Sequence, residues 1–324
     1  MKNKYKIYTD VKKGQENWVE ILTPFLGCPD KNPLHPDFGR FERFRNKGLD
    51  FLEITKDPSS SDVFVYSKKW SKNDKDLESF LLLAKEKNKK TLVFYNDDSS
   101  EDLKLENKNV ILFRTSFYKS SKKKHEESFP GWSNDPGGFL PRKKEKIPTV
   151  GFCGCANNNV HRFTALKNIS EDFNIVDNFI LYNRFYAGWG DGIKPPDDFE
   201  YARKVKSQFI NNIKNSDYVL CCRGAGNFSY RLYETLSCGR IPIIIDTDIV
   251  LPHENIIPWK EISVWIDSRE ISKVSEILLD HHKKISKLDF LNMQKSCRST
   301  YENFIRPTEF FKVWFKNNFG DKND

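Results

Sequence analysis

The sequence predicts an α/β protein in which two Rossmann-like domains face a cleft. Its 324 residues are enough for two domains of ordinary size. Short apolar runs rich in β-branched and aromatic residues alternate with segments of helical spacing, which is the pattern of a parallel sheet covered by helices. Residues 119–146, rich in serine, lysine, proline and glycine, interrupt this alternation once before it resumes.

The first domain is expected to span residues 1–145. Four apolar runs without alternation indicate strands that are buried on both faces. These predicted strands are residues 6–8, 62–66, 91–95 and 109–113. Between the second and third of them, residues 74–87 carry apolar side chains at helical spacing opposite lysines and glutamates. The resulting strand-helix-strand order is typical of a parallel sheet.

The second domain is expected to span residues 146–300. Its predicted strands are residues 148–153, 173–176, 218–222, 241–245 and 263–266. Its predicted helices are residues 159–167, 198–214 and 229–238. Residues 301–324 form the end of a last helical segment, which is expected to cross back onto the first domain. Pro307 permits that change of direction because proline interrupts a helix.

Composition restricts the classes of function. Aromatic residues make up 14% of the chain, and a disordered chain would be poor in them. The net charge of +8 permits nucleic-acid binding without indicating it, so nucleic acid is not among the expected partners. The seven cysteines are an odd number and most lie in apolar runs, which favours reduced thiols over disulfides or a metal site.

The beginning of the chain is basic but has no apolar stretch of the signal-peptide kind. No window approaches the ~18 apolar residues of a membrane span. We therefore expect a cytoplasmic protein. The basic residues at 122–124 and 142–146 are either a solvated surface loop or a patch for peripheral contact with the inner membrane face.

The most informative segment follows the predicted strand 218–222. The strand leads into a loop with Gly224 and Gly226, which let the backbone approach a ligand closely. Ser229 is a natural N-cap for the next helix, whose start presents free N–H groups and the positive end of a dipole. An anion, above all a diphosphate, is expected to bind there.

Charged residues flank this loop. Arg223 ends the strand and Arg231 lies on the first helical turn, where two guanidinium groups can neutralise phosphate charge as a leaving group departs. Glu234 is three residues after Arg231, and its carboxylate can accept hydrogen bonds from ribose hydroxyls. The alternative is an ordinary surface ion pair between these two residues. We assign Asn227 and Tyr230, within the same segment, to the same binding site.

The order of these residues resembles the exostosin-like family of glycosyltransferases. The gap between the two arginines matches the family motif without insertion. The matching residues are Arg223-Gly224, Arg231–Glu234, Ser237–Pro242, Leu251-Pro252 and Trp259, with weaker similarity at Asp57-Pro58, Ser61–Val65, Thr149–Phe152 and His161-Arg162. The chain departs from many relatives in having Cys222 before the first arginine and Ala-Gly-Asn-Phe as the loop.

The resemblance implies a GT-B architecture and transfer from a nucleotide-sugar, usually a UDP-sugar, with inversion and without a required metal or other cofactor. It makes Arg223 and Arg231 ligands of the diphosphate and Glu234 the acceptor for the ribose. Ser229 and its helix start would then cap the phosphates. Arginines and a helix dipole can take over the charge role that a metal has elsewhere.

Inversion requires a base that deprotonates the acceptor hydroxyl, and that base would come from the first domain. Asp97 and Asp98 directly follow the predicted strand 91–95 and are the candidate catalytic residues. The alternative is a solvated turn, since Asn-Asp-Asp-Ser-Ser is ordinary turn chemistry. His35 and His161 are reserve candidates.

Residues 182–192 are rich in aromatic residues and glycines. They are either a loop that closes over the cleft and stacks on sugar rings, or a plain long loop pinned by its aromatic side chains.

The sequence thus favours a hexosyl- or glycuronosyltransferase of polysaccharide biosynthesis, with a glycan or lipid-linked glycan as acceptor. One alternative is a GDP-fucose-dependent fucosyltransferase, which a preference for GDP would indicate. The other is a non-catalytic nucleotide- or glycan-binding protein, which binding without turnover would indicate.

Overall fold

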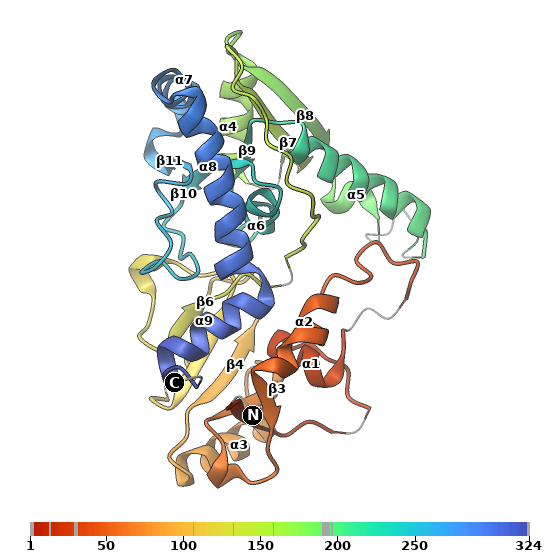
Figure 1. The fold of residues 1–324 in the computed structure, drawn as a ribbon, viewed down its shortest axis with the longest axis vertical. Helices are drawn as coiled ribbons and strands as arrows, with labels where there is room; N and C mark the ends of the chain where they lie inside the picture. The colour runs from red at the N-terminus through yellow and green to blue at the C-terminus, as the bar shows by residue number, and fades with distance from the viewer. Residues whose placement is uncertain are drawn as a thin grey trace.

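The computed structural model describes residues 3–322, except residues 13, 29–31, 106, 132, 158, 190–194 and 196. The chain forms two lobes, each built on a parallel sheet with helices packed against it (Figure 1). The predicted fold class, α/β with two Rossmann-like domains, is therefore confirmed. Several central strands are buried and mostly apolar runs, as is typical of parallel sheets.

The first sheet has the order β2-β1-β3-β4-β5-β6, with neighbouring strands parallel. Its strands are β1 (Tyr5–Thr9), β2 (Leu52–Ile54), β3 (Val63–Lys69), β4 (Thr91–Tyr95), β5 (Val110–Arg114) and β6 (Glu126–Ser128). Helices α1 (Thr23–Leu26), α2 (Glu42–Lys47) and α3 (Lys75–Glu86) belong to the same lobe. Asp74 caps α3 by accepting from the N–H of Leu77 at 3.3 Å, which explains why the helix begins there.

Strand β6 lies within the segment whose sequence pattern predicts only a connection. Glu126 is buried in it because Arg114 of the neighbouring strand donates to its Oε1 at 2.7 Å. The sequence of β6 is Glu-Glu-Ser, so no apolar run marks it as a strand. A buried carboxylate needs such a partner, and the partner is contributed by another strand.

The second sheet has the order β11-β10-β9-β7-β8, again parallel. Its strands are β7 (Thr149–Cys155), β8 (Val176–Tyr182), β9 (Tyr218–Cys221), β10 (Ile241–Asp246) and β11 (Val264–Asp267). The helices of this lobe are α4 (Val160–Ser170), α5 (Phe199–Lys214), α6 (Tyr230–Ser237), α7 (Val274–Lys284) and α8 (Lys287–Thr300).

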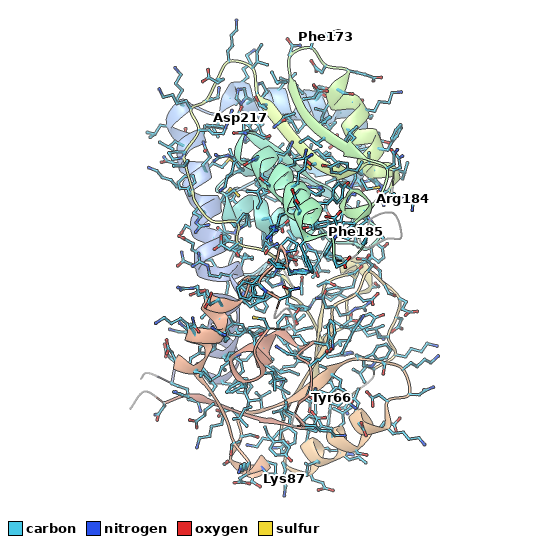
Figure 2. The ribbon with its side chains drawn as sticks, turned by 90° about the vertical axis from the view of Figure 1, so that its right-hand side faces the viewer. Tyr66, Lys87, Phe173, Arg184, Phe185 and Asp217 are labelled. Carbon is cyan, nitrogen blue, oxygen red and sulfur yellow. The ribbon has the colours of Figure 1, made fainter. Side chains whose placement is uncertain are left out.

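The predicted strand at 173–176 is wrong. Phe173 lies in the turn before β8 with its side chain 99% exposed, and the strand runs from Val176 to Tyr182. Strand β8 lies at the edge of the sheet and none of its residues is fully buried, so its side chains are mixed in polarity and the apolar pattern is weak. Figure 2 shows Phe173 at the far end of the upper lobe, and Phe185, just past β8, at the level where the lobes meet.

The end of the chain returns to the first lobe. After α8, a π-helical turn (η7, Tyr301–Ile305) leads into α9 (Pro307–Phe319). Phe311, Trp314 and Phe315 of α9 are buried in the same hydrophobic cluster as Ile7 of the first sheet. Figure 1 shows α8 along the upper lobe and α9 against the lower one. Burial of each aromatic side chain stabilises this return by roughly 2–3 kcal/mol.

The carboxyl ends of the two sheets face each other. Tyr118, beyond the end of β5, forms an isolated β-bridge with Ile249, beyond the end of β10. The N–H of Ser120 donates to the carboxylate of Asp248 at 2.9 Å, and the hydroxyl of Ser128 donates to the carbonyl of Val250 at 3.0 Å. Loops that follow strands of one lobe therefore contact loops that follow strands of the other.

Candidate functional site

The candidate site lies at the carboxyl ends of β7 and β9. In the second sheet, β8 lies on one side of β7 and β9 on the other, so the strand order reverses between β7 and β9. Open α/β sheets bind their ligands at this switch point. The loop after β9 carries Arg223, and α6 begins after that loop with Tyr230 and Arg231. The segment singled out in the sequence is therefore at the switch point.

Two arginines bind the ends of these strands. Arg162 of α4 donates to the carbonyl oxygens of Cys155 at 2.9 Å and Cys222 at 3.1 Å. Arg231 donates from Nη2 to the carbonyl oxygen of Cys153 at 2.7 Å. Both guanidinium groups thus sit directly at the gap between β7 and β9.

Both arginines also lie over the ring of Phe152, with their Cζ atoms 5.5 Å (Arg162) and 4.0 Å (Arg231) from the ring centre. Gly154 makes room for this arrangement, because a Cβ there would lie 2.8 Å from Nη2 of Arg231. Burial, together with the charge of Arg231, lowers the pKa of Arg162 to about 10, and burial also lowers the pKa of Arg231. Two neighbouring guanidinium groups that are largely shielded from solvent favour the binding of an anion between or beside them.

The described residues supply no carboxylate partner to Arg231. Some other arginines are ion-paired, as Arg114 is with Glu126 at 2.7 Å and Arg142 with Asp217 at 2.8 Å. By contrast, Nε of Arg231 is buried and has no hydrogen-bond partner in the part of the chain that the structure describes. This guanidinium group keeps hydrogen-bonding capacity that a bound anion could use.

Arg223 extends toward the first lobe. Its Nη1 donates to the hydroxyl of Tyr118 at 2.9 Å and its Nη2 to the carbonyl of Ala225 at 3.0 Å. Its Nε is buried and unpartnered among the described residues. The carbonyl of Gly224 accepts from Nδ2 of Asn159 at 3.3 Å, so the loop is also tied to the start of α4. Arg223 therefore lies at the junction of the lobes with one donor unused.

Gly226 and Asn227 serve the contact between the lobes. A Cβ on Gly226 would lie 2.9 Å from the backbone of Asp98, so the close approach that this glycine allows is to another loop of the protein. The N–H of Asn227 donates to Ser116 at 2.8 Å, and its Nδ2 donates to the carbonyl of Phe117 at 3.0 Å. The sequence interpretation gave both residues to ligand binding, whereas these contacts already use their backbone and amide groups.

Ser229 stands at the N-cap of α6 with extended φ and ψ of −149° and 113°. The predicted N-cap position of Ser229 is therefore confirmed, and its hydroxyl makes no capping hydrogen bond among the described residues. Tyr230 donates from its hydroxyl to Oδ1 of Asn96 at 2.7 Å. Tyr230 therefore links the start of α6 to the end of β4 in the first lobe.

Glu234 is buried on α6, with 9% of its surface exposed. Among the described residues its carboxylate accepts no hydrogen bond. Burial raises the pKa of Glu234, and the charges of Arg40 and Arg231 oppose that rise. The sequence predicts that this carboxylate accepts hydrogen bonds from a ligand. Because no described residue donates to it, the carboxylate is available for that role.

A polar cluster from both lobes lies near Glu234. Lys206 of α5 donates to Oδ1 of Asp37 and Arg40 donates to its Oδ2, both at 2.5 Å. Burial acts to raise the pKa of Asp37, but the charges of Arg40 and Lys206 lower it well below its usual range. Figure 1 shows the first-lobe loop before α2 reaching α5. No motif in the sequence pointed to this cluster.

Asp97 and Asp98 follow β4 but differ in their surroundings. Lys69 donates to Oδ2 of Asp97 at 2.5 Å, and the N–H of Ser99 donates to Oδ1 at 2.9 Å. Burial acts to raise the pKa of Asp97, but these hydrogen bonds lower it. Partial desolvation, together with the charge of Asp97, raises the pKa of Asp98. The residue as a whole is exposed, and its carboxylate takes no hydrogen bond from the described residues. Of the two, Asp98 is the better placed to accept a proton.

Sequence reasoning missed Glu20, which lies in the 3-10 helix η1 (Glu20–Leu22) and is 2% exposed. Its Oε1 accepts from Nδ2 of Asn96 at 3.1 Å, and its Oε2 is buried with no partner among the described residues. Burial raises the pKa of Glu20 to about 8. Through Asn96 this carboxyl group is connected to Tyr230 of α6. The sequence has no signal for it, because its burial depends on distant elements.

The reserve histidines are in structural positions. Nδ1 of His35 accepts from the N–H of Asp37 at 3.1 Å, and its ring packs on Trp189 with 5.6 Å between centres. Nδ1 of His161 lies 3.2 Å from Oδ1 of Asn159 at the start of α4. In the aromatic segment predicted as a loop, residues 190–192 lie outside the described residues.

Other features lie elsewhere. Surface hollows of about 490 and 620 Å³ between β11, α7 and α8 share no residue with this site. In the described residues, no group of three or more His, Cys, Asp or Glu side chains is placed to hold a metal ion. None of the described helices combines the length and apolar character needed to cross a bilayer.

Residues 190–280 match the Exostosin GT47 domain. The chain is 35% identical over 80 residues to a probable glucuronosyltransferase of Oryza sativa subsp. japonica, a match that covers 25% of this chain and 18% of the relative. It is 32% identical over 80 residues to a probable β-1,4-xylosyltransferase of Arabidopsis thaliana, covering 25% of this chain and 19% of the relative. The matched part thus spans about a fifth of the length of these relatives.

Solved structures resemble the chain more loosely. A TarM variant of S. aureus, in complex with fondaparinux, alpha-GlcNAc-glycerol and UDP, gives a TM-score of 0.42 at 9% identity, covering 78% of this chain and 54% of that chain. The GtfA/B complex gives a TM-score of 0.42 at 11% identity, covering 81% of this chain and 57% of that chain.

Proposed function

We propose that this chain, whose residues 190–280 match the Exostosin GT47 domain, is an inverting glycosyltransferase that uses a UDP-sugar. The acceptor would be a hydroxyl group of a glycan or of a lipid-linked glycan. The donor diphosphate would bind at the carboxyl ends of β7 and β9, and the acceptor would approach from the first lobe.

One observation supports the proposal most: Arg231 is a half-buried cation at the switch point whose Nε is buried without a hydrogen-bond partner among the described residues, and no carboxylate there forms an ion pair with it. A buried guanidinium N–H without an acceptor is costly, and a diphosphate oxygen would offset that cost. Arg162 beside it and Arg223 at the lobe junction add positive charge to the same edge. Charge that develops on the leaving diphosphate would be stabilised there.

Asp98 is the base in this proposal. The oxygen of the acceptor hydroxyl attacks the anomeric carbon from the face opposite the diphosphate. The bond between that carbon and the diphosphate oxygen breaks, UDP departs with the bonding electrons, and the hydroxyl proton passes to the Asp98 carboxylate. A base with a raised pKa accepts this proton more readily. Asp97 is less suited, because Lys69 already binds its carboxylate.

The cytoplasmic location and the peripheral membrane contact also remain proposals. The exposed side chains of Lys122 and Lys124 support contact with an anionic surface, where a lipid-linked acceptor would be found.

The test is a donor screen with the full chain in EDTA, measuring free nucleotide released from UDP-glucuronic acid, UDP-xylose, UDP-N-acetylglucosamine and GDP-fucose. We expect slow release of UDP from one UDP-sugar without added metal. We also expect NMR to show that the product has the anomeric configuration opposite to that of the donor. Preferential release of GDP would support the fucosyltransferase alternative. Tight nucleotide binding with no release from any donor would support a non-catalytic binding protein.

A further inference from the structure

The segment between β8 and α5 carries strained backbone. Tyr186 has φ and ψ of 46° and 35°, and Ala187 has 54° and 26°. Both residues are in the left-handed region, which costs of order 1–3 kcal/mol for a residue other than glycine. The hydroxyl of Tyr201 on α5 donates to the carbonyl of Ala187 at 2.8 Å and holds the backbone in place. Two adjacent strained residues indicate that side-chain placement matters here.

The strained backbone directs unpartnered polar atoms into the interior. The hydroxyl of Tyr186 and Nε1 of Trp189 are both buried, and neither has a hydrogen-bond partner among the residues that the structure describes. Their rings pack together with 5.2 Å between centres, and His35 of the first lobe packs against Trp189. Burying a hydroxyl or an indole N–H without a partner is unfavourable, so these atoms are candidates for hydrogen bonds to a ligand.

These atoms belong to a segment that packs against β7. The 3-10 helix η5 (Phe185–Gly188), which carries Tyr186, contacts β7, and the carboxyl end of β7 holds Arg231 through the carbonyl of Cys153. Burial and the charge of Asp37, with a contribution from Glu234, raise the pKa of the Tyr186 hydroxyl. Glu234 is three residues along α6 from Arg231, and both have side-chain hydrogen-bonding capacity left. The Tyr186 hydroxyl and the Trp189 indole N–H, which have no partner among the described residues, therefore lie on a segment packed against the strand that holds the guanidinium group proposed to bind phosphate.

We propose that Tyr186 and Trp189 bind the nucleoside part of the donor, with the Tyr186 hydroxyl and the Trp189 indole N–H as hydrogen-bond partners beside Glu234. The inference rests on the proposed function, because it takes the diphosphate at Arg231 as given. The ribose is bonded directly to the diphosphate, so a nucleoside bound here would extend from Arg231 past Glu234, and the packed rings of Tyr186 and Trp189 suit its planar base. Aromatic rings and neutral hydrogen-bond donors are the usual surroundings of such a ligand.

The test compares Tyr186→Phe with wild type by calorimetric titration of UMP, UDP and the active UDP-sugar into the full chain. We expect affinity to fall roughly ten-fold, the scale of one hydrogen bond, and by the same factor for all three ligands because they share the nucleoside. Tyr182→Phe is the matched control, since its hydroxyl is already bonded to Gln208 at 2.8 Å and its loss should leave UDP binding unchanged. The thermal midpoint of Tyr186→Phe should equal or exceed that of wild type, because the lost hydroxyl has no hydrogen-bond partner in the described part of the chain.

Trp189→Phe provides a second variant, which keeps an aromatic ring and removes the N–H. This substitution should lower the affinity for UMP and for UDP by the same factor. Unchanged UMP and UDP affinity in both variants would overturn the inference while leaving the proposed function standing. A loss confined to the UDP-sugar would also overturn it, because the two residues would then contact the transferred sugar. Absence of UDP binding to the wild-type chain would instead contradict the proposed function.

Discussion

The two sheets share one strand order, but their facing ends carry different side chains. In each lobe the first strand lies between the second and the third. At the carboxyl ends of β1 and β3 in the first lobe, the N–H of Ser67 donates to Asp10 at 3.0 Å and Gln15 donates to the carbonyl of Ser67 at 2.8 Å. Neutral and acidic groups therefore occupy these strand ends. At the same point in the second lobe, Arg162 and Arg231 occupy the strand ends.

The facing ends of the two lobes differ in charge, and the proposed function gives each end a different role. Carboxyl groups gather near the end of β4, where Glu20, Asp97 and Asp98 lie, and guanidinium groups gather at β7 and β9. An anionic donor is attracted to the second group and repelled by the first. A base that takes a proton from a neutral acceptor belongs on the acidic side. Under the proposed function, one scaffold used twice would provide two different halves of a transfer site.

The largest expected effect comes from removing the base on the acidic side. Asp98→Asn should lower turnover by roughly 10²–10⁴-fold, the usual contribution of general base catalysis, and should leave UDP affinity unchanged. Asp97→Asn is the matched control, because its carboxylate is held by Lys69, and it should keep turnover within a few-fold of wild type. Steady-state UDP release measures both. Equal losses in the two variants would assign neither as the base.

The next effect concerns Glu20 and the dependence of stability on pH. Burial raises the pKa of Glu20 to about 8 in the folded chain, so its stabilising contribution is fully present below its ordinary pKa near 4.5 and is lost as pH rises to about 8. Between pH 5 and 8, the unfolding free energy of wild type should fall relative to Glu20→Gln by on the order of 3 kcal/mol. Urea denaturation at several pH values measures this.

The exposed residue Glu16 provides the control for that experiment, because Glu16→Gln should leave the pH profile of wild type unchanged. Parallel profiles for wild type and Glu20→Gln would mean that the Glu20 carboxyl group ionises normally, and the acidic side would then hold one more charge than we infer.

The third prediction concerns the cationic side. Arg231→Met should weaken UDP binding by roughly 10–100-fold, the scale of a charged hydrogen bond, without lowering the free energy of unfolding. Stability should hold because methionine keeps the packing on Phe152, and removal of a half-buried cation with an unpartnered Nε offsets loss of its single hydrogen bond to the Cys153 carbonyl among the described residues. Arg240→Met is the structural control, since Arg240 donates to the carbonyls of Leu140 and Lys214 at 2.9 Å, and it should lose stability while the folded fraction binds UDP normally. Loss of stability in Arg231→Met together with loss of UDP affinity in Arg240→Met would contradict the assignment of Arg231 to diphosphate binding.

Much of the fold could be predicted because buried parallel strands are apolar along their whole length, as in β4 and β10. The prediction failed at β8, an edge strand with exposed positions, and at β6, where Glu126 is buried only through Arg114 of another strand. Sequence spacing shows neither edge position nor a partner in a different strand.

The candidate site was predictable only in part, and for the same reason. The segment from Arg223 to Glu234 has local order that the sequence displays. Whether Gly226 and Asn227 face a ligand or the other lobe depends on how the lobes dock, and the structure places them against Asp98 and Ser116. The burial of Glu20 likewise arises from tertiary packing and leaves no mark in the sequence around it.

The most direct test is a calorimetric titration of UDP, GDP, CDP and ADP into the full wild-type chain in EDTA, repeated with Mg²⁺. If the arginines at β7 and β9 bind a nucleotide diphosphate, UDP should bind most tightly and with the same affinity in EDTA and in Mg²⁺. No binding of any of the four nucleotides would contradict a diphosphate site at this edge.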